Sequence, residues 1–303
     1  MIDVSIIIVN WNTRDLLHDC IESALRTAGP LKVEIIVVDN ASTDGSVAMV
    51  RRQYPFIKLI ANSQNVGFAR ANNQAVAASR GQYLLLLNSD AHLLPNSLQS
   101  MAATLAAGPA VGLVGAQLRN SDGSFQASYS PFPGLWQEFL ILSSLGRRLY
   151  GRWYPSRGPQ DCQGPAVVGY VEGACMLVRR EAYQAVGGLD EAYFMYAEDV
   201  EICYALRQKG WQVCYQPAAL VVHLGGGSSQ SRGPERESDL YCSRVRFFHR
   251  HYGIVAALAL SAQILAFTAA KTLAYKFLRL ISHGRYGRAV VPLGRLAFQL
   301  RHV

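Results

Sequence analysis

Strand-like and helix-like segments alternate from residue 5 to residue 107, and this alternation constrains the fold more than any other feature of the chain. Runs of Ile, Val and Leu without polar alternation are typical of strands covered on both faces. Each of four such runs is followed by a stretch with helical spacing, at residues 5–9 and 13–27, 34–38 and 44–52, 57–61 and 67–79, and 83–87 and 95–107. The pattern predicts an α/β fold in which right-handed βαβ units build a mostly parallel central sheet flanked by helices.

The regular alternation of strand-like and helix-like segments ends after residue 110. Residues 113–180 contain turn signals and a Pro/Gly-rich stretch at 152–165. This composition predicts a more antiparallel half with a mobile loop at which an acceptor is received. The further elements expected in this half are strands at 166–171, 174–178, 211–215 and 219–222, and a helix at 198–209.

Composition narrows the class of protein. Half of the 303 residues are hydrophobic and 17% are charged, which excludes a disordered chain. The six cysteines form no CxxC pair, which argues against a thiolate zinc site and indicates reduced thiols. The first five residues lack the basic region and cleavage site of a signal peptide. We therefore expect a cytoplasmic protein.

The positive charge is concentrated at the C-terminal end. The formal net charge is +8, yet no acidic residue follows Asp239, where ten basic residues occur. The rest of the chain holds 19 basic and 21 acidic residues, a net of −2. This distribution favours a cationic end that faces an anionic membrane surface, and it disfavours nucleic acid as a partner.

Residues 254–281 are strongly apolar but are interrupted by Lys271, Lys276 and Arg279. The uninterrupted part, 254–270, has 17 residues, which is at the short end for a bilayer span. We expect an interfacial helix whose lysines reach the headgroups, followed by a basic tail. The alternatives are a helix that packs on the catalytic domain or on a second subunit, and a true span.

Polar residues follow three of the predicted parallel strands, where open α/β sheets bind their ligands. They are Asn10 and Asn12 after the first strand, Asp39 after the second, and Asn88, Ser89 and Asp90 after the fourth. The chain has neither a GxGxxG motif after the first strand nor a Walker A loop. A nucleotide bound here would therefore be held by carboxylates and a hard cation such as Mg²⁺ or Mn²⁺, for which Asp90 is suited.

Several longer motifs occur in a characteristic order. They are Ile8 to Asn12 (IVNWN), Val38 to Ser46 (VDNASTDGS), Asn65 to Ala69 (NVGFA), Leu87 to Asp90 (LNSD), Gly173 to Arg180 (GACMLVRR), Gly188 to Glu191 (GLDE), Tyr196 to Glu201 (YAEDVE) and the late His223. In this order they resemble the inverting family 2 glycosyltransferases with a GT-A fold, particularly the bacterial rhamnosyltransferase-like branch. The resemblance runs from Val4 to about Tyr252.

The resemblance implies roles for the strand-end residues. Asp39 would accept a hydrogen bond from the N3–H of uracil or thymine. Asp90 would be the metal-binding acid of an Asp-X-Asp element whose first position is Asn88 here, and His223 would be a further metal ligand. The remaining nucleotide-sugar contacts would come from Asn10, Asn12, Asn65, Gly67, Arg70, Asn88 and Ser89.

The resemblance also implies that Asp199 is the general base, supported by Glu198, Glu201 and Asp190. One carboxylate would take the proton from the acceptor hydroxyl while its oxygen attacks the anomeric carbon. The neighbouring carboxylates raise the proton affinity of Asp199, whereas its place at a helix start lowers it. The sequence leaves open which effect is larger.

The expected protein is thus a metal-dependent inverting glycosyltransferase that uses a dTDP- or UDP-sugar, with rhamnose as the expected sugar. The acceptor would be a glycan or lipid-linked glycan, and the enzyme would lie at the inner face of the cell membrane, with a homo-oligomer left open. Its catalytic domain would be residues 1–252, divided into a nucleotide-sugar half at 1–110 and an acceptor half at 111–252. Residues 253–303 would associate with the membrane. A sugar-phosphate nucleotidyltransferase and a non-catalytic binding module are the alternatives.

Overall fold

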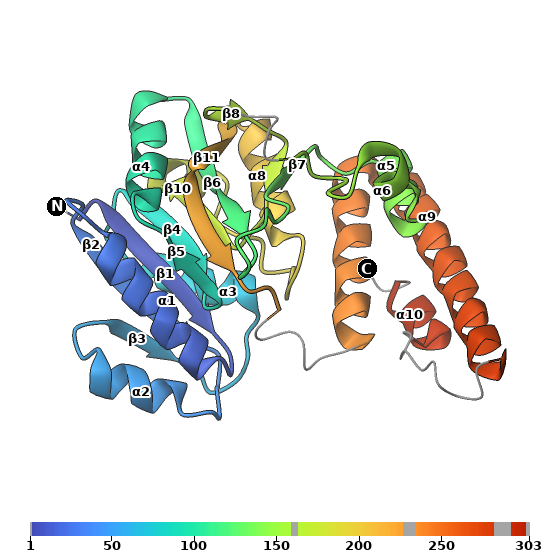
Figure 1. Cartoon of the computed structure of the whole chain (residues 1–303), viewed down its shortest axis with the longest axis horizontal. Helices are drawn as coiled ribbons and strands as arrows, with labels where there is room; N and C mark the ends of the chain where they lie inside the picture. The colour runs from blue at the N-terminus through green and yellow to red at the C-terminus, as the bar shows by residue number, and fades with distance from the viewer. Residues whose placement is uncertain (1, 159–162, 227–233, 282–291, 301–303) are drawn as a thin grey trace. The chain divides into compact units, whose positions relative to one another are not determined.

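The computed structural model describes residues 2–158, 163–226, 234–281 and 292–300 (Figure 1). The chain forms two compact units. The sheet unit comprises residues 1–132, 156–194 and 198–228, and the helical unit comprises 133–155, 195–197 and 229–303. Part of the expected mobile loop, 159–162, and most of the expected basic tail, 282–291 and 301–303, lie outside the described residues.

The first half of the sheet unit has the predicted strand and helix order. Strand β1 pairs in parallel with β2 and β4, and β2 pairs in parallel with β3. The elements are β1 (Val4–Asn10), α1 (Arg14–Thr27), β2 (Val33–Asp39), α2 (Ser46–Gln53), β3 (Lys58–Ala61), α3 (Phe68–Ala77), β4 (Tyr83–Asn88) and α4 (Ser97–Ala107). The expected α/β class with a mostly parallel core is therefore confirmed.

Antiparallel pairings extend this sheet on the side of β4. Strand β10 lies between β4 and β6 and is antiparallel to both, and β11 continues the sheet parallel to β6. The sheet order is β3-β2-β1-β4-β10-β6-β11-β5, with β8 beside β11. The new elements are β5 (Ala91–Leu93), β6 (Val111–Arg119), β8 (Ala166–Val167), β10 (Cys175–Arg179) and β11 (Gln212–His223).

Two of the sequence expectations in this half need correction. The strands expected at 211–215 and 219–222 are one strand, β11, because its pairing with β6 shifts register between Gln216 and Leu220 without ending. The strand expected at 166–171 is interrupted: Ala166–Val167 pairs with β11, whereas β9 (Tyr170–Val171) pairs with β7 (Tyr129–Ser130) in a separate ribbon. Local apolar runs do not specify which partner strand they meet.

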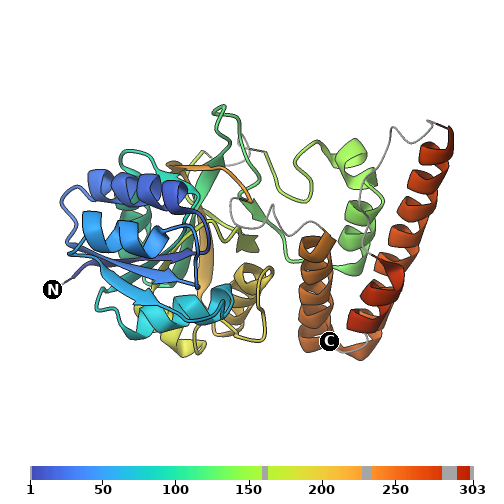
Figure 2. The ribbon, with the colours of Figure 1, turned by 90° about the horizontal axis from the view of Figure 1, so that it is seen from below.

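Helices cover both faces of the sheet, as the continuous apolar strands predicted (Figure 2). Ile6 and Ile8 face a core shared with α1, α2 and α4. Ile7 faces the opposite core, shared with α3, α7 (Arg180–Ala185) and α8 (Glu198–Gln208). The alternation of side chains along a strand divides each buried run between the two cores.

The helical unit contains α5 (Leu135–Leu142), α6 (Leu145–Tyr150), α9 (Pro234–Ile281) and α10 (Leu293–Leu300). Helix α9 is broken at Gly253, whose φ of 84° is not helical, and its two segments run back along each other (Figure 1). Lys271 Nζ accordingly lies 4.0 Å from Glu237 Oε1. The helix expected at 254–281 is the second of these segments.

The units do not follow the boundary expected at residue 252. Helices α5 and α6, expected within the acceptor half, group with α9, because Phe139 stacks edge-on against Phe267 with ring centroids 5.6 Å apart. The Tyr252 hydroxyl also donates to the Pro133 carbonyl at 2.9 Å. By length and composition, residues 235–278 are the one helix in the described part of the chain that is long and apolar enough to cross a membrane.

A buried ion pair joins α5 to the first segment of α9. Arg244 Nη1 donates to Glu138 Oε2 at 2.8 Å, and the Glu138 side chain is only 3% exposed. Burial raises the pKa of the Glu138 carboxyl, although the Arg244 charge opposes the shift. We predict that Glu138→Ala lowers the free energy of unfolding of the helical unit by about 3 kcal/mol, because Arg244 loses its counter-charge.

Hydrogen exchange of the α5 and α9 amides measures this effect. The exposed partner of Arg14, Asp15, provides the control, and Asp15→Ala should leave exchange unchanged. Equal exchange in the two variants would show that the Glu138 pair does not stabilise the unit.

Candidate active site

A chain of buried hydrogen bonds links the carboxyl ends of β1, β2 and β4. The Asn10 amide donates to Asp39 Oδ2 at 2.8 Å and accepts from Thr13 Oγ1 at 2.6 Å. Thr13 Oγ1 lies 2.9 Å from Ser89 Oγ. Because the Thr13 proton goes to Asn10, Ser89 is the donor in that bond. The predicted residues Asn10, Asp39 and Ser89 are therefore brought together by contacts that no single motif contains.

The loops after β1 and β2 also bind each other. The Asn12 backbone N–H donates to Ser42 Oγ at 2.8 Å, and Asn12 Oδ1 accepts from the Thr43 N–H at 2.7 Å. Asn12 and Ala41 have φ values of 54° and 63°, in the left-handed region. Such backbone costs about 1 kcal/mol or more per residue and clusters at functional sites.

Asn65, Gly67 and Arg70 lie at the start of α3. Asn65 Oδ1 accepts from the Gly67 N–H at 3.0 Å. Gly67 has a φ of 87°, and a Cβ there would lie 2.8 Å from the Phe194 carbonyl oxygen. Arg70 Nε lies 3.8 Å from Glu191 Oε2, at the surface. The close approach at Gly67 is thus to the segment before α8, and the nucleotide contacts of these three residues stay predictions.

Asp90 and His223 meet where β4 and β11 end. His223 Nε2 lies 3.4 Å from Asp90 Oδ1, and both side chains are largely buried. The described residues hold no group of three or more His, Cys, Asp or Glu side chains arranged to bind a metal. Among the described residues, the groups at this position that could bind a divalent cation are therefore one carboxylate and one imidazole.

Gln126 is a residue that the sequence did not single out, and it orients His223. Its Nε2 donates to Asn120 Oδ1 at 3.2 Å and to the His223 carbonyl at 3.4 Å. These two acceptors turn Gln126 Oε1 toward His223 Nδ1, 2.8 Å away. Nδ1 then donates its proton to Gln126 Oε1, and Nε2 is the ring nitrogen that faces Asp90. Gln126 lies 97 residues before His223 in the chain, so no local pattern pointed to this contact.

Asp199 lies in the first turn of α8 and contacts the segment that precedes β10. Its Oδ2 accepts from the Gly173 N–H at 2.9 Å, and its Oδ1 accepts from the Val200 N–H at 2.8 Å. The neighbouring Ala174 carbonyl accepts from the Asn88 N–H at 3.0 Å. Asp199 is therefore one hydrogen-bonded step from the Asn88–Asp90 turn.

The supporting carboxylates differ in their surroundings. Glu198 Oε2 is buried without a hydrogen-bond partner among the described residues, and burial together with the Asp199 charge raises the pKa of Glu198 to about 8. Glu201 is also buried and accepts from the Tyr193 hydroxyl at 3.1 Å. Asp190 caps a local turn by accepting from the Ala192 N–H at 3.0 Å. The sequence anticipated mutual repulsion, and in the structure burial is the larger cause of the raised pKa of Glu198.

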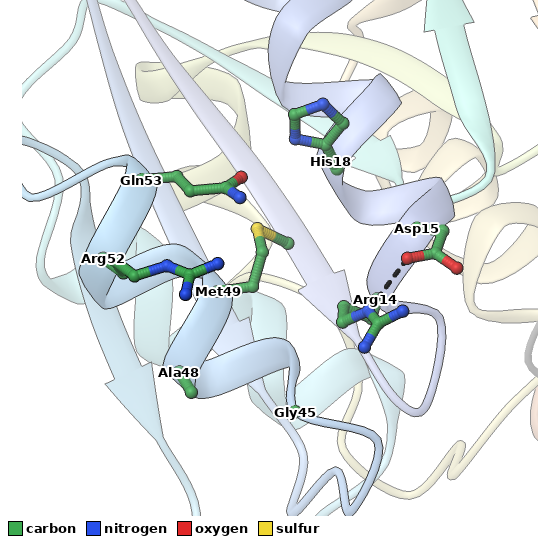
Figure 3. Close-up of a pocket in the computed structure, with 8 residues that line it drawn as sticks. All are labelled: Arg14, Asp15, His18, Gly45, Ala48, Met49, Arg52 and Gln53. Carbon is green, nitrogen blue, oxygen red and sulfur yellow. Dashed lines mark hydrogen bonds and ion pairs between the residues drawn. The ribbon is translucent and has the colours of Figure 1, made fainter.

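A cavity of about 480 Å³ lies between α1 and α2 (Figure 3). It is lined by Arg14, Asp15, His18, Gly45, Ala48, Met49, Arg52 and Gln53. Arg14 Nε donates to Asp15 Oδ1 at 2.8 Å, and His18 Nδ1 lies 2.6 Å from the Tyr54 hydroxyl. The lining includes none of the predicted site residues, and the candidate site is therefore the network at the strand ends.

Comparison with known proteins identifies the class. Residues 5–187, more than half of the chain, match the family described as glycosyl transferase family 2. The chain therefore belongs to glycosyltransferase family 2 and is a glycosyltransferase. This finding excludes the binding-module alternative and favours sugar transfer over nucleotidyl transfer.

The similarity to rhamnosyltransferases is also confirmed. The N-acetylglucosaminyl-diphospho-decaprenol L-rhamnosyltransferase of Mycobacterium tuberculosis is 30% identical over 66% of this chain and 69% of its own length. Rhamnosyltransferase WbbL of Escherichia coli K12 is 26% identical over 75% of this chain and 86% of its own.

Solved structures support the fold. GalNAc-T7 with UDP, GalNAc and Mn²⁺ has a TM-score of 0.59 at 17% identity, covering 82% of this chain and 48% of that one. The mannosyltransferase PcManGT from Pyrobaculum calidifontis, in complex with GDP-Man and Mn²⁺, has a TM-score of 0.57 at 19% identity, covering 99% of this chain and 84% of that one. The predicted GT-A fold is confirmed.

The Gln126 contact predicts the tautomer of His223. In the metal-free protein we expect the neutral His223 ring to carry its proton on Nδ1, and Gln126→Leu to produce a mixture with the Nε2–H form. Gln126→Glu should restore the Nδ1–H form, because a carboxylate oxygen also accepts from Nδ1.

Long-range ¹H–¹⁵N spectra of the histidine rings, assigned with His223→Asn, measure the tautomer. Ser121→Ala changes an exposed side chain of the same turn and is the matched control. An unchanged His223 pattern in Gln126→Leu would contradict the orienting contact.

The proton on Glu198 makes stability depend on pH. The carboxyl binds its proton more tightly when folded than in the unfolded chain, where its pKa is near 4.5. Its stabilising contribution is complete below that value and is lost as the pH rises to about 8. We predict that the melting temperature of Glu198→Gln, relative to wild type, rises steadily between pH 5 and pH 8. Parallel melting curves at every pH would show that Glu198 is ionised in the folded protein.

Proposed function

We propose that this glycosyltransferase transfers a sugar, with rhamnose from dTDP-rhamnose as the expected donor, to a lipid-linked glycan with inversion of the anomeric configuration. This proposal is carried by a set of hydrogen bonds: Asn10 joins Asp39 and Thr13, Thr13 joins Ser89 beside Asp90, and the Gly173–Ala174 segment joins Asn88 and Asp199. The similarity to a relative named for rhamnosyl transfer to a lipid diphosphate supports the choice of donor and acceptor.

The nucleotide would lie over the ends of β1 and β2. Asp39 is fixed by Asn10 on one oxygen and by the Ser42 N–H, at 2.8 Å, on the other. A carboxylate accepts about four hydrogen bonds, so Asp39 retains capacity for the imide N3–H of uracil or thymine. An adenine base, which has no such donor, would be disfavoured.

Asp90 and His223 fit a divalent cation. Two ligand atoms at right angles around Mg²⁺ lie about 3 Å apart, close to the 3.4 Å between Asp90 Oδ1 and His223 Nε2. Gln126 orients the imidazole with its Nε2 lone pair toward Asp90, as a metal ligand requires. Such a cation, Mg²⁺ or Mn²⁺, would complete its shell with substrate phosphates and balance the charge of the leaving diphosphate.

Asp199 would act as the general base. Its two oxygens are positioned by the Gly173 and Val200 N–H groups, which hold the carboxylate without transferring a proton to it. The neutral Glu198 beside it adds no second negative charge at neutral pH. Asp199 would accept the proton of the acceptor hydroxyl as that oxygen attacks the anomeric carbon from the face opposite the diphosphate, which inverts the configuration.

We further propose that the protein works at the inner face of the cell membrane. The acid-free end of the chain and the exposed apolar second segment of α9 support attachment to an anionic surface. A lipid-linked acceptor would be met there.

The base assignment predicts a separation of binding from turnover. Asp199→Asn should lower release of nucleoside diphosphate at least roughly 100-fold, because the amide cannot take the acceptor proton. Binding of the nucleotide with Mn²⁺, measured by calorimetry, should be unchanged. The exposed Asp19→Asn is the control and should match wild type in both assays. Undiminished turnover in Asp199→Asn would exclude Asp199 as the base.

A further inference from the structure

The net positive charge of the protein comes from the helical unit. It contains 15 of the 29 Lys and Arg residues but only 4 of the 21 Asp and Glu residues, a net of +11, whereas the sheet unit has a net of −3. One of the four acids, Glu138, is buried against Arg244. Three of these cations, Arg147, Arg148 and Arg152, lie on or just after α6, so the positive charge is not confined to the C-terminal end of the chain.

Exposed apolar side chains gather on the same unit. Twelve of the sixteen large hydrophobic side chains that are exposed among the described residues lie in it. On α5 and α6 these include Trp136, Leu149 and Tyr150, each about two thirds exposed, and after Gly253 they include Val255 and Leu258. A soluble protein seldom exposes this much apolar surface without a partner.

These side chains belong to elements that meet at one end of the unit. The Tyr252 hydroxyl donates to the Pro133 carbonyl at 2.9 Å, which places the start of α5 at the turn of α9 (Figure 1). Trp136 stacks on Phe139 at 5.3 Å, and Phe139 contacts Phe267 of the second α9 segment. We call this end, formed by α5, α6 and the turn at Gly253, the basic aromatic end.

Positive side chains border the apolar ones within α6. Arg147 and Arg148 are exposed and immediately precede Leu149 and Tyr150, and Arg152 is exposed just beyond the helix. Residues 139–160 contain no acidic residue. Aromatic side chains beside exposed arginines are typical of segments that enter the headgroup region of an anionic bilayer.

We propose that the basic aromatic end is a membrane-binding surface that inserts Trp136, Leu149 and Tyr150 into an anionic bilayer, in addition to the contact expected from residues 253–303. The proposal rests on the proposed function only in that a lipid-linked acceptor requires this location. A second copy of the chain is a poorer partner, because two such ends would bring like charges together. An anionic lipid surface complements both the charge and the apolar groups.

Flotation of the full chain with phosphatidylglycerol-containing vesicles tests the surface. We expect a triple variant, Trp136→Ser with Leu149→Ser and Tyr150→Ser, to bind these vesicles with an affinity at least roughly tenfold lower than that of wild type. This loss is expected even though the C-terminal residues of the variant are intact. Phe56→Ser is the matched control, since Phe56 is 69% exposed on the sheet unit, and it should bind as wild type does. Flotation of the triple variant at the wild-type level would overturn the proposal.

A second measurement reports insertion directly and needs no turnover. Brominated lipids should quench tryptophan fluorescence in wild type, and less so in Trp136→Phe. Equal quenching in both would overturn the proposal. The proposal would also be overturned if sedimentation velocity showed a dimer for wild type and a monomer for the triple variant while vesicle binding stayed unchanged. The surface would then be an interface between copies of the chain. Neither assay depends on sugar transfer, so a failure of the proposed function is seen separately, as absence of nucleoside diphosphate release.

Discussion

The Asn10 side chain holds together the part of the molecule on which the candidate site depends. Parallel pairing of β1 with β2 places Asn10 opposite Asp39, and pairing of β1 with β4 places Val9 opposite Asn88. The Asn10 amide uses both ends of its group, donating to Asp39 and accepting from Thr13, which in turn contacts Ser89. A buried amide satisfied on both sides fixes the spacing of three strand ends, because leaving either end unpaired would be costly.

Strand β10, which is antiparallel to its neighbours, connects the strand ends to the second part of the candidate site. It lies beside β4, so that the Gly173–Ala174 segment reaches Asn88 on one side and Asp199 on the other. Asp199 comes from a helix 109 residues after Asp90 in the sequence. The proposed base and the proposed nucleotide region are thus joined through the Gly173–Ala174 segment, by a side-chain contact at Asp199 and a backbone contact at Asn88.

Charge is distributed differently in the two units, and this bears on how the enzyme meets its acceptor. The sheet unit is slightly acidic and supplies the residues of the candidate site, whereas the helical unit is strongly basic and exposes aromatic and aliphatic side chains. A basic unit with exposed apolar groups favours an anionic membrane surface, and a lipid-linked acceptor would be concentrated there. The proposed membrane contact and the proposed transfer reaction therefore use separate parts of one chain.

The α/β class, the first four parallel strands with their helices, and the family could be predicted from the amino-acid sequence, because apolar periodicity and motifs can be read along the chain. The sequence also indicated Asn10, Asp39 and Ser89 as strand-end residues, since parallel strands end at one edge of a sheet. The folded molecule was needed to show that Gln126 orients His223, that burial raises the pKa of Glu198, and that α5 and α6 join α9. Each of these features depends on burial or on contacts between residues far apart in the chain. The local spacing of residues predicts neither which distant residues will meet nor which polar groups will be buried.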